Sequence, residues 1–316
     1  MIYLLIFLAF ILILIAYFQI AQRYAILDKP NERSSHSLPT IRGGGVIFLF
    51  AAICACAAHS EFLLPLSALM LIGIISLIDD INGLSSYLRL LFHIISFTIL
   101  WIYFHVFQIM PLFAFLLLYL ISIAVINAYN FMDGINGITG TYSLVILAGL
   151  QFINLYRFSF IEEDMIWFPL LACLAFLFFN FRNKARCFAG DVGSITVSFW
   201  IVILLFQLIL RTHNFIYILF LSVYGVDAGM TIIARLYKKE NIFKPHRQHF
   251  YQILANEQKI PHLVIAVMYS LLQLVIIIFI ILGLTSPLLT SLIVLIPLIA
   301  AYIMLKPILL HSPAKN

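Results

Sequence analysis

Long apolar segments follow one another along almost the entire 316-residue chain. A helix needs about 20 mainly apolar residues to cross a bilayer, and about eleven segments of suitable length occur here. They lie at 2–20, 45–60, 62–78, 88–107, 112–128, 138–156, 165–181, 192–210, 215–234, 263–283 and 288–305. Only 10% of the residues are charged, against about 25% in soluble proteins, which excludes a large water-soluble catalytic domain. The sequence therefore predicts an all-α, polytopic integral membrane protein with about eleven transmembrane helices.

Basic residues are divided unequally between the two sets of alternating loops. All of the 18 Lys and Arg residues except Arg157 and Arg211 fall in one set. The positive-inside rule makes that side cytoplasmic, with the N-terminus outside and the C-terminus in the cytoplasm. Because the charges are spread over several loops rather than gathered in one basic domain, the sequence does not favour nucleic-acid binding.

The predicted cytoplasmic loops carry nearly all of the side chains capable of chemistry. We expect a single domain, residues 1–316, whose active site is formed by the loops 21–44, 79–87, 127–139, 182–194 and 235–262. The first apolar segment has neither a basic region before it nor a cleavage site after it, so we expect a retained helix and not a signal peptide. The four Cys residues form no CxxC pair and predict no disulfide framework.

Two adjacent carboxylates, Asp79 and Asp80, end the third apolar segment. At the C-terminus of a helix they face the negative end of the dipole and repel one another, so they need a cation, a proton or a basic partner. A solvated helix end is the alternative. The pair favours a functional site, in which the two groups either bind a metal or accept a proton.

A second polar cluster follows the fifth apolar segment. Asn127 and Asn130 are three residues apart, so they share one face of a helix, and Asp133 continues that row. Gly134 and Gly137 then allow the backbone to approach a ligand closely. Oxygen and amide groups in this arrangement suit a hard cation or a nucleotide-sugar. The alternative is a polar turn at the membrane interface without a ligand.

The sequence Gly190-Asp191-Val192-Gly193-Ser194 directly precedes another apolar segment. Asp191 or Ser194 can cap the helix that starts here. Such a helix N-terminus also favours a phosphate, through its N–H groups and its dipole, and a carboxylate beside it can hold Mg²⁺.

The longest cytoplasmic loop contains the sequence Lys244-Pro245-His246-Arg247-Gln248-His249. Two imidazoles that flank a guanidinium form a compact phosphate-binding group. The alternative is an exposed basic loop attracted to anionic lipid, while a zinc site lacks further ligands nearby.

Asp227 lies near the inner end of the ninth segment, where a charge is expensive. We expect it to be either a functional acid or the structural partner of Arg235.

These motifs, in this order, resemble those of the polyprenyl-phosphate N-acetylhexosamine-1-phosphate transferases of glycosyltransferase family 4. The resemblance covers about residues 1–300 and rests on five sequences: Asp28-Lys-Pro-Asn-Glu-Arg33-Ser-Ser-His36 with Pro39-Thr-Ile-Arg42-Gly-Gly-Gly45; Asp79-Asp80; Asn127 to Gly137; Gly190 to Ser194; and His246 to His249. It implies transfer of a sugar-1-phosphate from a UDP-sugar donor to the lipid undecaprenyl phosphate, with Mg²⁺ or Mn²⁺, and release of UMP. It also implies a bacterial inner-membrane enzyme whose active site faces the cytoplasm, and it allows a homodimer.

The resemblance also assigns roles to residues. It makes Asp79, Asp80 and Asp133 catalytic and Asp191 the metal ligand. The implied substrate-binding residues are Arg42, Asn127, Asn130, Asn136, His246, Arg247 and His249.

Two departures from the family pattern refine this expectation. Many members have Asp where this chain has Asn136, and the neutral amide suits hydrogen bonding better than metal binding. The loop that ends at His249 lacks three consecutive histidines. This points to the branch that initiates O-antigen and enterobacterial common antigen, with a plain UDP-N-acetylhexosamine as donor.

Two other classes of protein are alternatives. A transporter would place charges near the bilayer midplane and show repeated halves with broken helices. A lipid phosphatase would transfer phosphate to water and would need no nucleotide. The acidic residues cluster instead at the inner ends of the predicted spans, which favours the transferase.

Overall fold

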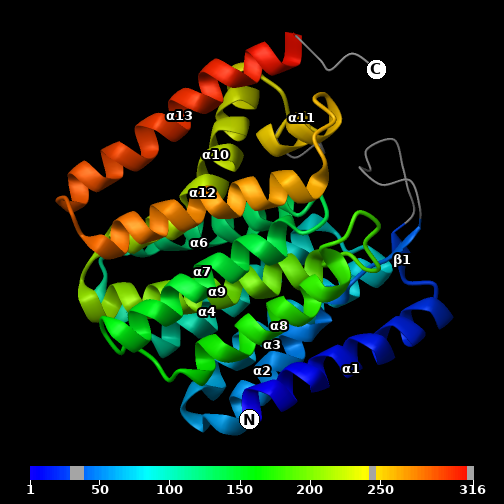
Figure 1. The fold of residues 1–316 in the computed structure, drawn as a ribbon. Coiled ribbons are helices and arrows are strands. Elements are labelled where there is room, and N and C mark those ends of the chain that lie inside the picture. Colours follow the sequence, from blue (N-terminus) through cyan, green and yellow to red (C-terminus); the bar gives the residue numbers. More distant parts are fainter. Residues whose placement is uncertain (29–38, 242–246, 312–316) are drawn as a thin grey trace.

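The computed structural model describes residues 1–28, 39–241 and 247–311, and this part of the chain is almost entirely helical (Figure 1). The helices are α1 (Ile2–Arg23), α2 (Ile47–Ala58), α3 (Leu63–Asn82), α4 (Ser86–Tyr103), α5 (Val106–Ile109), α6 (Leu112–Met132), α7 (Ile138–Tyr156), α8 (Asp164–Asn180), α9 (Gly190–Thr212), α10 (Ser222–Tyr237), α11 (Phe250–Asn256), α12 (His262–Leu282) and α13 (Pro287–His311). The shorter elements are η1 (Gly44–Val46), η2 (Ser60–Phe62), η3 (Phe215–Leu221), β1 (Leu27–Asp28) and β2 (Thr40–Ile41).

The helices match the predicted transmembrane segments. Within the described ranges, nine helical segments are long and apolar enough to cross a membrane. Two shorter apolar helices, Gly44–Ala58 and Asp164–Asn180, correspond to the second and seventh predicted segments. Each of the eleven predicted segments therefore has a helical counterpart, and the all-α polytopic fold is confirmed.

Helix α9 forms the centre of the bundle. Of its most apolar 18-residue window, 89% is buried, against 17% for the corresponding windows of α6 and α13. An all-round apolar helix is stable where other helices surround it, and α9 packs against α2, α3, α6 and α7. Figure 1 shows α12 and α13 along one edge of the bundle and α1 along the opposite edge. The first turn of α9 is therefore held by several neighbouring elements.

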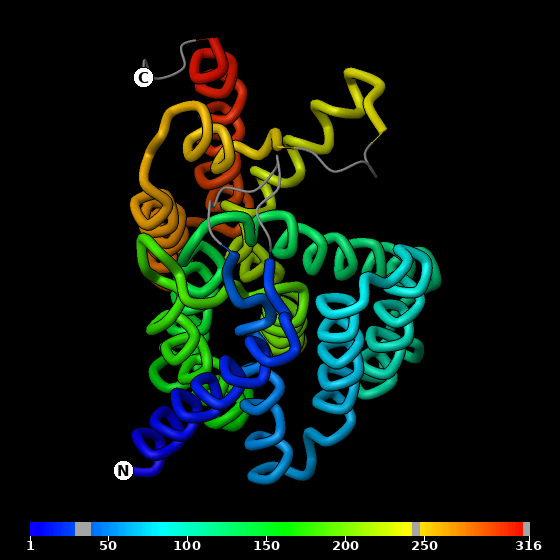
Figure 2. Tube along the Cα trace, turned by 90° about the vertical axis from the view of Figure 1, so that its right-hand side faces the viewer, coloured from blue at the N-terminus to red at the C-terminus, as the bar shows by residue number. Residues whose placement is uncertain are grey.

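Three of the predicted cytoplasmic loops meet at one end of the bundle, which faces the viewer in Figure 2. Strand β1 pairs antiparallel with β2, and the carbonyl of Ile41 accepts the N–H of Phe188 at 2.8 Å. The side chain of Asn136 donates to the carbonyl of Arg182 at 2.9 Å. These bonds join the loop before α2, the loop after α6 and the loop before α9.

Two glycines bring the backbone of η1 against the first turn of α9. A Cβ atom added at Gly45 would lie 2.0 Å from the Cα of Gly193, which no real structure tolerates. The N–H of Gly45 donates to the carbonyl of Ala189 at 3.0 Å. The close contact of the two backbones therefore depends on the absence of side chains at both positions.

This contact can be tested with the variant Gly45→Ala. Forcing the two backbones apart should cost about 1–3 kcal/mol and lower the midpoint of thermal unfolding in detergent by about 3–10 °C. Gly225→Ala is the matched control, because a Cβ there meets no atom within 4 Å and alanine is the better helix former. If Gly45→Ala unfolds at the wild-type temperature, the close contact is not present.

Candidate active site

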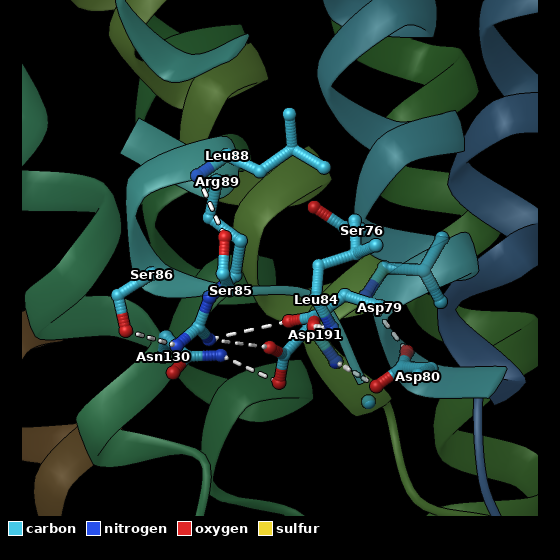
Figure 3. Close-up of polar contacts among 12 residues, drawn as sticks. Ser76, Asp79, Asp80, Leu84, Ser85, Ser86, Leu88, Arg89, Asn130 and Asp191 are labelled. Carbon is cyan, nitrogen blue, oxygen red and sulfur yellow. Dashed lines mark hydrogen bonds and ion pairs between the residues drawn. The ribbon is translucent and has the colours of Figure 1, made fainter. Parts of the chain in front are cut away.

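Asp80 holds the N-terminus of α9 from the last turn of α3 (Figure 3). Its carboxylate accepts the N–H of Asp191 at 2.9 Å and the N–H of Val192 at 3.0 Å. Arg42 Nε lies 2.7 Å from Asp80 Oδ1, and the side chain of Asp80 is 0% exposed. The first N–H groups of a helix have no partner within the helix, so a carboxylate from another segment stabilises them.

The prediction that these N–H groups bind phosphate is wrong for the structure described here. The N–H groups of Asp191 and Val192 are both donated to Asp80. Gly190 precedes them with a φ of +72°, and a Cβ at this position would lie 2.4 Å from Asp80 Oδ2. The glycine motif therefore serves to admit the carboxylate of Asp80.

Asp79 and Asp80 form ion pairs with different arginines. Arg89, in the first turn of α4, places Nη1 at 3.2 Å from Asp79 Oδ2. The backbone N–H of Leu84 also donates to Asp79. Of the cation, proton or basic partner that the acidic pair was predicted to need, a basic partner is present for each member: Arg89 for Asp79 and Arg42 for Asp80.

Asp191 lies between the two arginines. Its carboxylate accepts a hydrogen bond from Asn130 Nδ2 at 3.0 Å, and it lies 3.4 Å from Arg42 and 3.5 Å from Arg89. Asn130 also donates to the hydroxyl of Ser194 at 3.1 Å. Three carboxylates thus share two guanidinium groups, so the cluster retains an excess of negative charge that attracts a cation or a proton.

The other two predicted asparagines bind backbone carbonyls. Asn127 Nδ2 donates to the carbonyl of Ile123 in its own helix at 2.8 Å. Asn136 Nδ2 donates to the carbonyls of Arg182 and Asn183 at 2.9 and 3.3 Å. In this structure Asn136 therefore fixes the loop before α9, while its role toward substrate stays a prediction.

Asp133 follows the last residue of α6, outside the membrane-spanning segment. Burial raises the pKa of its carboxyl to about 8. The negative charges of Asp191 and Asp80 also raise this pKa, whereas the nearby hydroxyl of Thr139 lowers it. A carboxyl with such a pKa is mostly protonated at neutral pH and can donate a hydrogen bond.

The predicted histidine motif is only partly covered by the structure. His246 lies outside the described residues, and Arg247 is partly exposed. His249 is 1% exposed, between the rings of Phe131 and Tyr251 at centroid distances of 6.1 and 6.0 Å. The imidazole of His249 is thus part of the packed interior.

Asp227 does not form the predicted structural pair. In the described part of the chain its ionic contact is with His249 Nδ1 at 3.6 Å, whereas Arg235 Nε lies 3.0 Å from Glu240 Oε2. The alternative of an Asp227–Arg235 pair is therefore wrong.

Sequence reasoning missed two residues that shape this end of the bundle. Arg89 was used only to predict the membrane topology. The short connection between α3 and α4 could have indicated that its side chain contacts Asp79. Asn180 accepts the N–H of Gly137 at 2.7 Å and donates to the carbonyl of Cys187 at 2.8 Å. Asn180 is a polar residue at the end of the apolar helix α8, and this position could have indicated its role.

The cluster fits a divalent cation that is shared with a substrate. Among residues 1–28, 39–241 and 247–311, no three His, Cys, Asp or Glu side chains form a ready-made metal site. Mg²⁺ usually takes only one or two carboxylates from the protein, together with water and substrate phosphates. Asp191 suits this role because its side chain is 15% exposed and its contacts with the arginines are long.

The raised pKa of Asp133 has a measurable consequence for stability. The folded protein keeps the proton up to about pH 8, while the unfolded chain releases it near pH 4, so the free energy of unfolding should fall as the pH rises through this range. Asp133→Asn cannot titrate, and its thermal midpoint should fall less between pH 5 and 8. Both thermal midpoints are measured in detergent with a chelator. If they change equally with pH in the wild type and in Asp133→Asn, the pKa of Asp133 is not raised.

The sequence was also compared with known proteins. The profile of glycosyl transferase family 4 matches residues 62–209, a range that contains Asp79, Asp80, Asn130 and Asp191. A phospho-N-acetylmuramoyl-pentapeptide-transferase of Dictyoglomus turgidum is 33% identical over 174 residues, which are 49% of this chain and 55% of that protein.

Two further relatives align over a longer range. The probable undecaprenyl-phosphate N-acetylglucosaminyl 1-phosphate transferase of Bacillus subtilis is 25% identical over 256 residues. The undecaprenyl-phosphate alpha-N-acetylglucosaminyl 1-phosphate transferase of Escherichia coli K12 is 24% identical over 264 residues. Each alignment covers 75% of this chain and 71% of the relative. Residues 62–209 thus match the profile of glycosyl transferase family 4, and the chain is similar over a longer range to sugar-1-phosphate transferases.

Proposed function

We propose that this protein transfers an N-acetylhexosamine-1-phosphate from a UDP-sugar to undecaprenyl phosphate and releases UMP. The observation that carries the proposal is the cluster of Asp79, Asp80 and Asp191 with Arg42 and Arg89 at one end of a membrane-spanning bundle. The names of the Bacillus subtilis and Escherichia coli relatives support the same acceptor and a similar sugar.

The two substrates make a strong electrostatic demand on the site. A lipid phosphate and a nucleotide diphosphate are both anions, so bringing them together requires positive charge. Arg42 and Arg89 supply it from the loop before α2 and from the start of α4, and Arg247 adds a third guanidinium from the loop before α11. Preorganised charges of this kind stabilise a phosphoryl-transfer transition state.

Mg²⁺, or Mn²⁺ in its place, would be held by Asp191 and would neutralise charge on the diphosphate. The chain's own residues position the groups around it. Asn130 orients Asp191 from α6, while Asp80 fixes the backbone of the same residue.

In the transfer itself, an oxygen of the lipid phosphate forms a bond to the phosphorus that carries the sugar. The bond from this phosphorus to the oxygen of UMP breaks at the same time, so one phosphoanhydride replaces another. The lipid phosphate is already ionised near neutral pH and needs no base. Because Asp80 is fully engaged by two N–H groups and Arg42, we assign it a positioning role and not that of a proton acceptor.

The proposed location of the enzyme is the bacterial inner membrane, with the cluster on the cytoplasmic side. The asymmetry of the basic residues supports this orientation. We further assign the chain to the branch that initiates surface polysaccharides such as O-antigen, because the loop that ends at His249 lacks three consecutive histidines. A homodimer is compatible with the proposal.

One observation favours a second donor. The Dictyoglomus turgidum relative has the higher identity of 33%, and its name specifies a phospho-N-acetylmuramoyl-pentapeptide as the transferred group. UDP-N-acetylmuramoyl-pentapeptide is therefore the alternative to a plain UDP-N-acetylhexosamine.

The proposal is tested by measuring UMP release from UDP-N-acetylglucosamine by purified protein with Mg²⁺. Release should require undecaprenyl phosphate. Asp191→Asn should lower the rate by about 100-fold or more, because an amide binds Mg²⁺ far more weakly than a carboxylate. Asp164→Asn is the matched control at the other end of the bundle and should retain the rate.

Three results would contradict the proposal. UMP release without any lipid phosphate would indicate hydrolysis. Turnover of the muramoyl-pentapeptide donor alone would favour the alternative substrate. A wild-type rate for Asp191→Asn at ordinary Mg²⁺ concentrations would remove this residue from the metal site.

A further inference from the structure

Asp227 is a buried carboxylate that binds the start of α11. It lies on α10, and its side chain is 5% exposed. Its two oxygens accept the backbone N–H of Phe250 at 2.7 Å and the backbone N–H of Tyr251 at 3.2 Å. The hydroxyl of Tyr269, on α12, donates to Asp227 Oδ2 at 2.7 Å. One side chain thus joins α10 and α12 to the segment that follows Arg247.

The same segment packs against the end of α6 and the turn that follows it. The hydroxyl of Tyr251 donates to the carbonyl of Phe131 at 2.9 Å. A Cβ atom at Gly134 would lie 2.1 Å from that hydroxyl, so the turn is shaped to receive the tyrosine. Whatever fixes Tyr251 therefore also fixes the segment relative to the polar cluster at the end of α6.

A second contact, from α13, also holds the segment. The ammonium of Lys306, on α13, donates to the carbonyl of Gln248 at 2.6 Å and contacts the hydroxyl of Tyr302. Tyr302 in turn shares a hydrogen bond of 2.8 Å with Thr231, one turn after Asp227. The backbone from Gln248 to Tyr251 is thus fixed by residues of α10, α12 and α13.

The buried carboxylate of Asp227 is an expensive way to stabilise this contact. In the described part of the chain, no Lys or Arg lies within ion-pair distance of Asp227, and His249 Nδ1 at 3.6 Å is its ionic partner. A buried charge is expensive, and well-packed apolar residues often give equal or greater stability. A carboxylate is favoured where backbone N–H groups must be held in one place.

We propose that Asp227 is a positioning residue that sets where Arg247 and His249 stand relative to the nucleotide-sugar donor. The expected change in donor binding rests on the proposed function. The expected release of α11 does not depend on it. Loss of the carboxylate should release the start of α11 and weaken donor binding, while the groups around Asp191 keep their contacts.

The first test measures hydrogen–deuterium exchange in the purified full-length protein. Asp227→Asn should raise the exchange rate of the Phe250 and Tyr251 amides by about tenfold or more, since these amides lose a charged acceptor. Asp164→Asn is a matched control, because Asp164 also accepts a tyrosine hydroxyl at 2.7 Å and contacts a histidine, here His59 at 2.9 Å. The control should leave exchange in residues 247–256 unchanged.

The second test separates binding from chemistry. Asp227→Asn should raise the KM for the UDP-sugar by about tenfold with kcat changed by less than about threefold, whereas a general loss of folded protein would lower kcat alone. Asp227→Glu, which keeps the charge, should recover part of the donor affinity. If wild-type protein turns over no UDP-sugar, the proposed function fails, and the exchange measurement still decides whether Asp227 holds α11.

A conservative variant covers the case in which Asp227→Asn does not fold. Tyr269→Phe removes only the hydroxyl that donates to Asp227 and should raise both the exchange of residues 247–256 and the donor KM in the same direction, by a smaller factor. If amide exchange of residues 247–256 is unchanged in Asp227→Asn, the proposal is wrong. If Asp227→Asn does not fold, unchanged exchange in Tyr269→Phe overturns it. An unchanged donor KM in an active variant would overturn it as well.

Discussion

The N-terminus of α9 cannot leave its N–H groups without partners inside a membrane protein, and Asp80 provides the acceptor. Unsatisfied backbone groups are expensive where water is excluded, and the carboxylate of Asp80 binds two of them at 2.9 and 3.0 Å. This contact fixes the end of α3 to the start of α9. Arg42 joins the same carboxylate, so the loop before α2 is fixed as well, and Asp191 is presented at a defined position.

The balance of charge around this contact suits it to substrates that bring phosphate and a cation together. Two guanidinium groups neutralise only part of the charge of three carboxylates, and Asp191 has the longest contacts with them. In the proposed reaction Asp191 would hold the metal that accompanies a diphosphate, and Arg42 and Arg89 would supply positive charge near the phosphates. The cluster also lies where helices from several parts of the chain end, so loops of different origin can bind the two substrates.

Much of this architecture could be predicted because it follows from local sequence. The length of each apolar segment is dictated by the bilayer, so α3, α9 and the other long helices could be located closely. The motifs at Asp79, Asn130 and Asp191 could be predicted to form a site because polar groups at helix ends are few in such a chain. Their mutual contacts could not be derived, since Asp80 and Asp191 are 111 residues apart in sequence and meet only through the packing of α3 on α9.

The incorrect pairing of Asp227 with Arg235 has a physical cause. Asp227 and Arg235 are eight residues apart on one helix, which places their backbones about 12 Å apart, so a partner from the loop before α11 was closer. The packing of His249 between Phe131 and Tyr251 could not be predicted either, because it depends on contacts between segments far apart in sequence.

We propose that Asp191, held by Asp80 and Asn130, binds the metal that accompanies the nucleotide-sugar. The most direct measurement is an experimental structure of the protein with Mn²⁺ and a UDP-sugar, in which anomalous scattering locates the ion. We predict an anomalous peak about 2.1 Å from a carboxylate oxygen of Asp191, with Asp80 still bound to the N–H groups of Asp191 and Val192. A peak on Asp79 or Asp80 instead, with the start of α9 released from Asp80, would contradict this account.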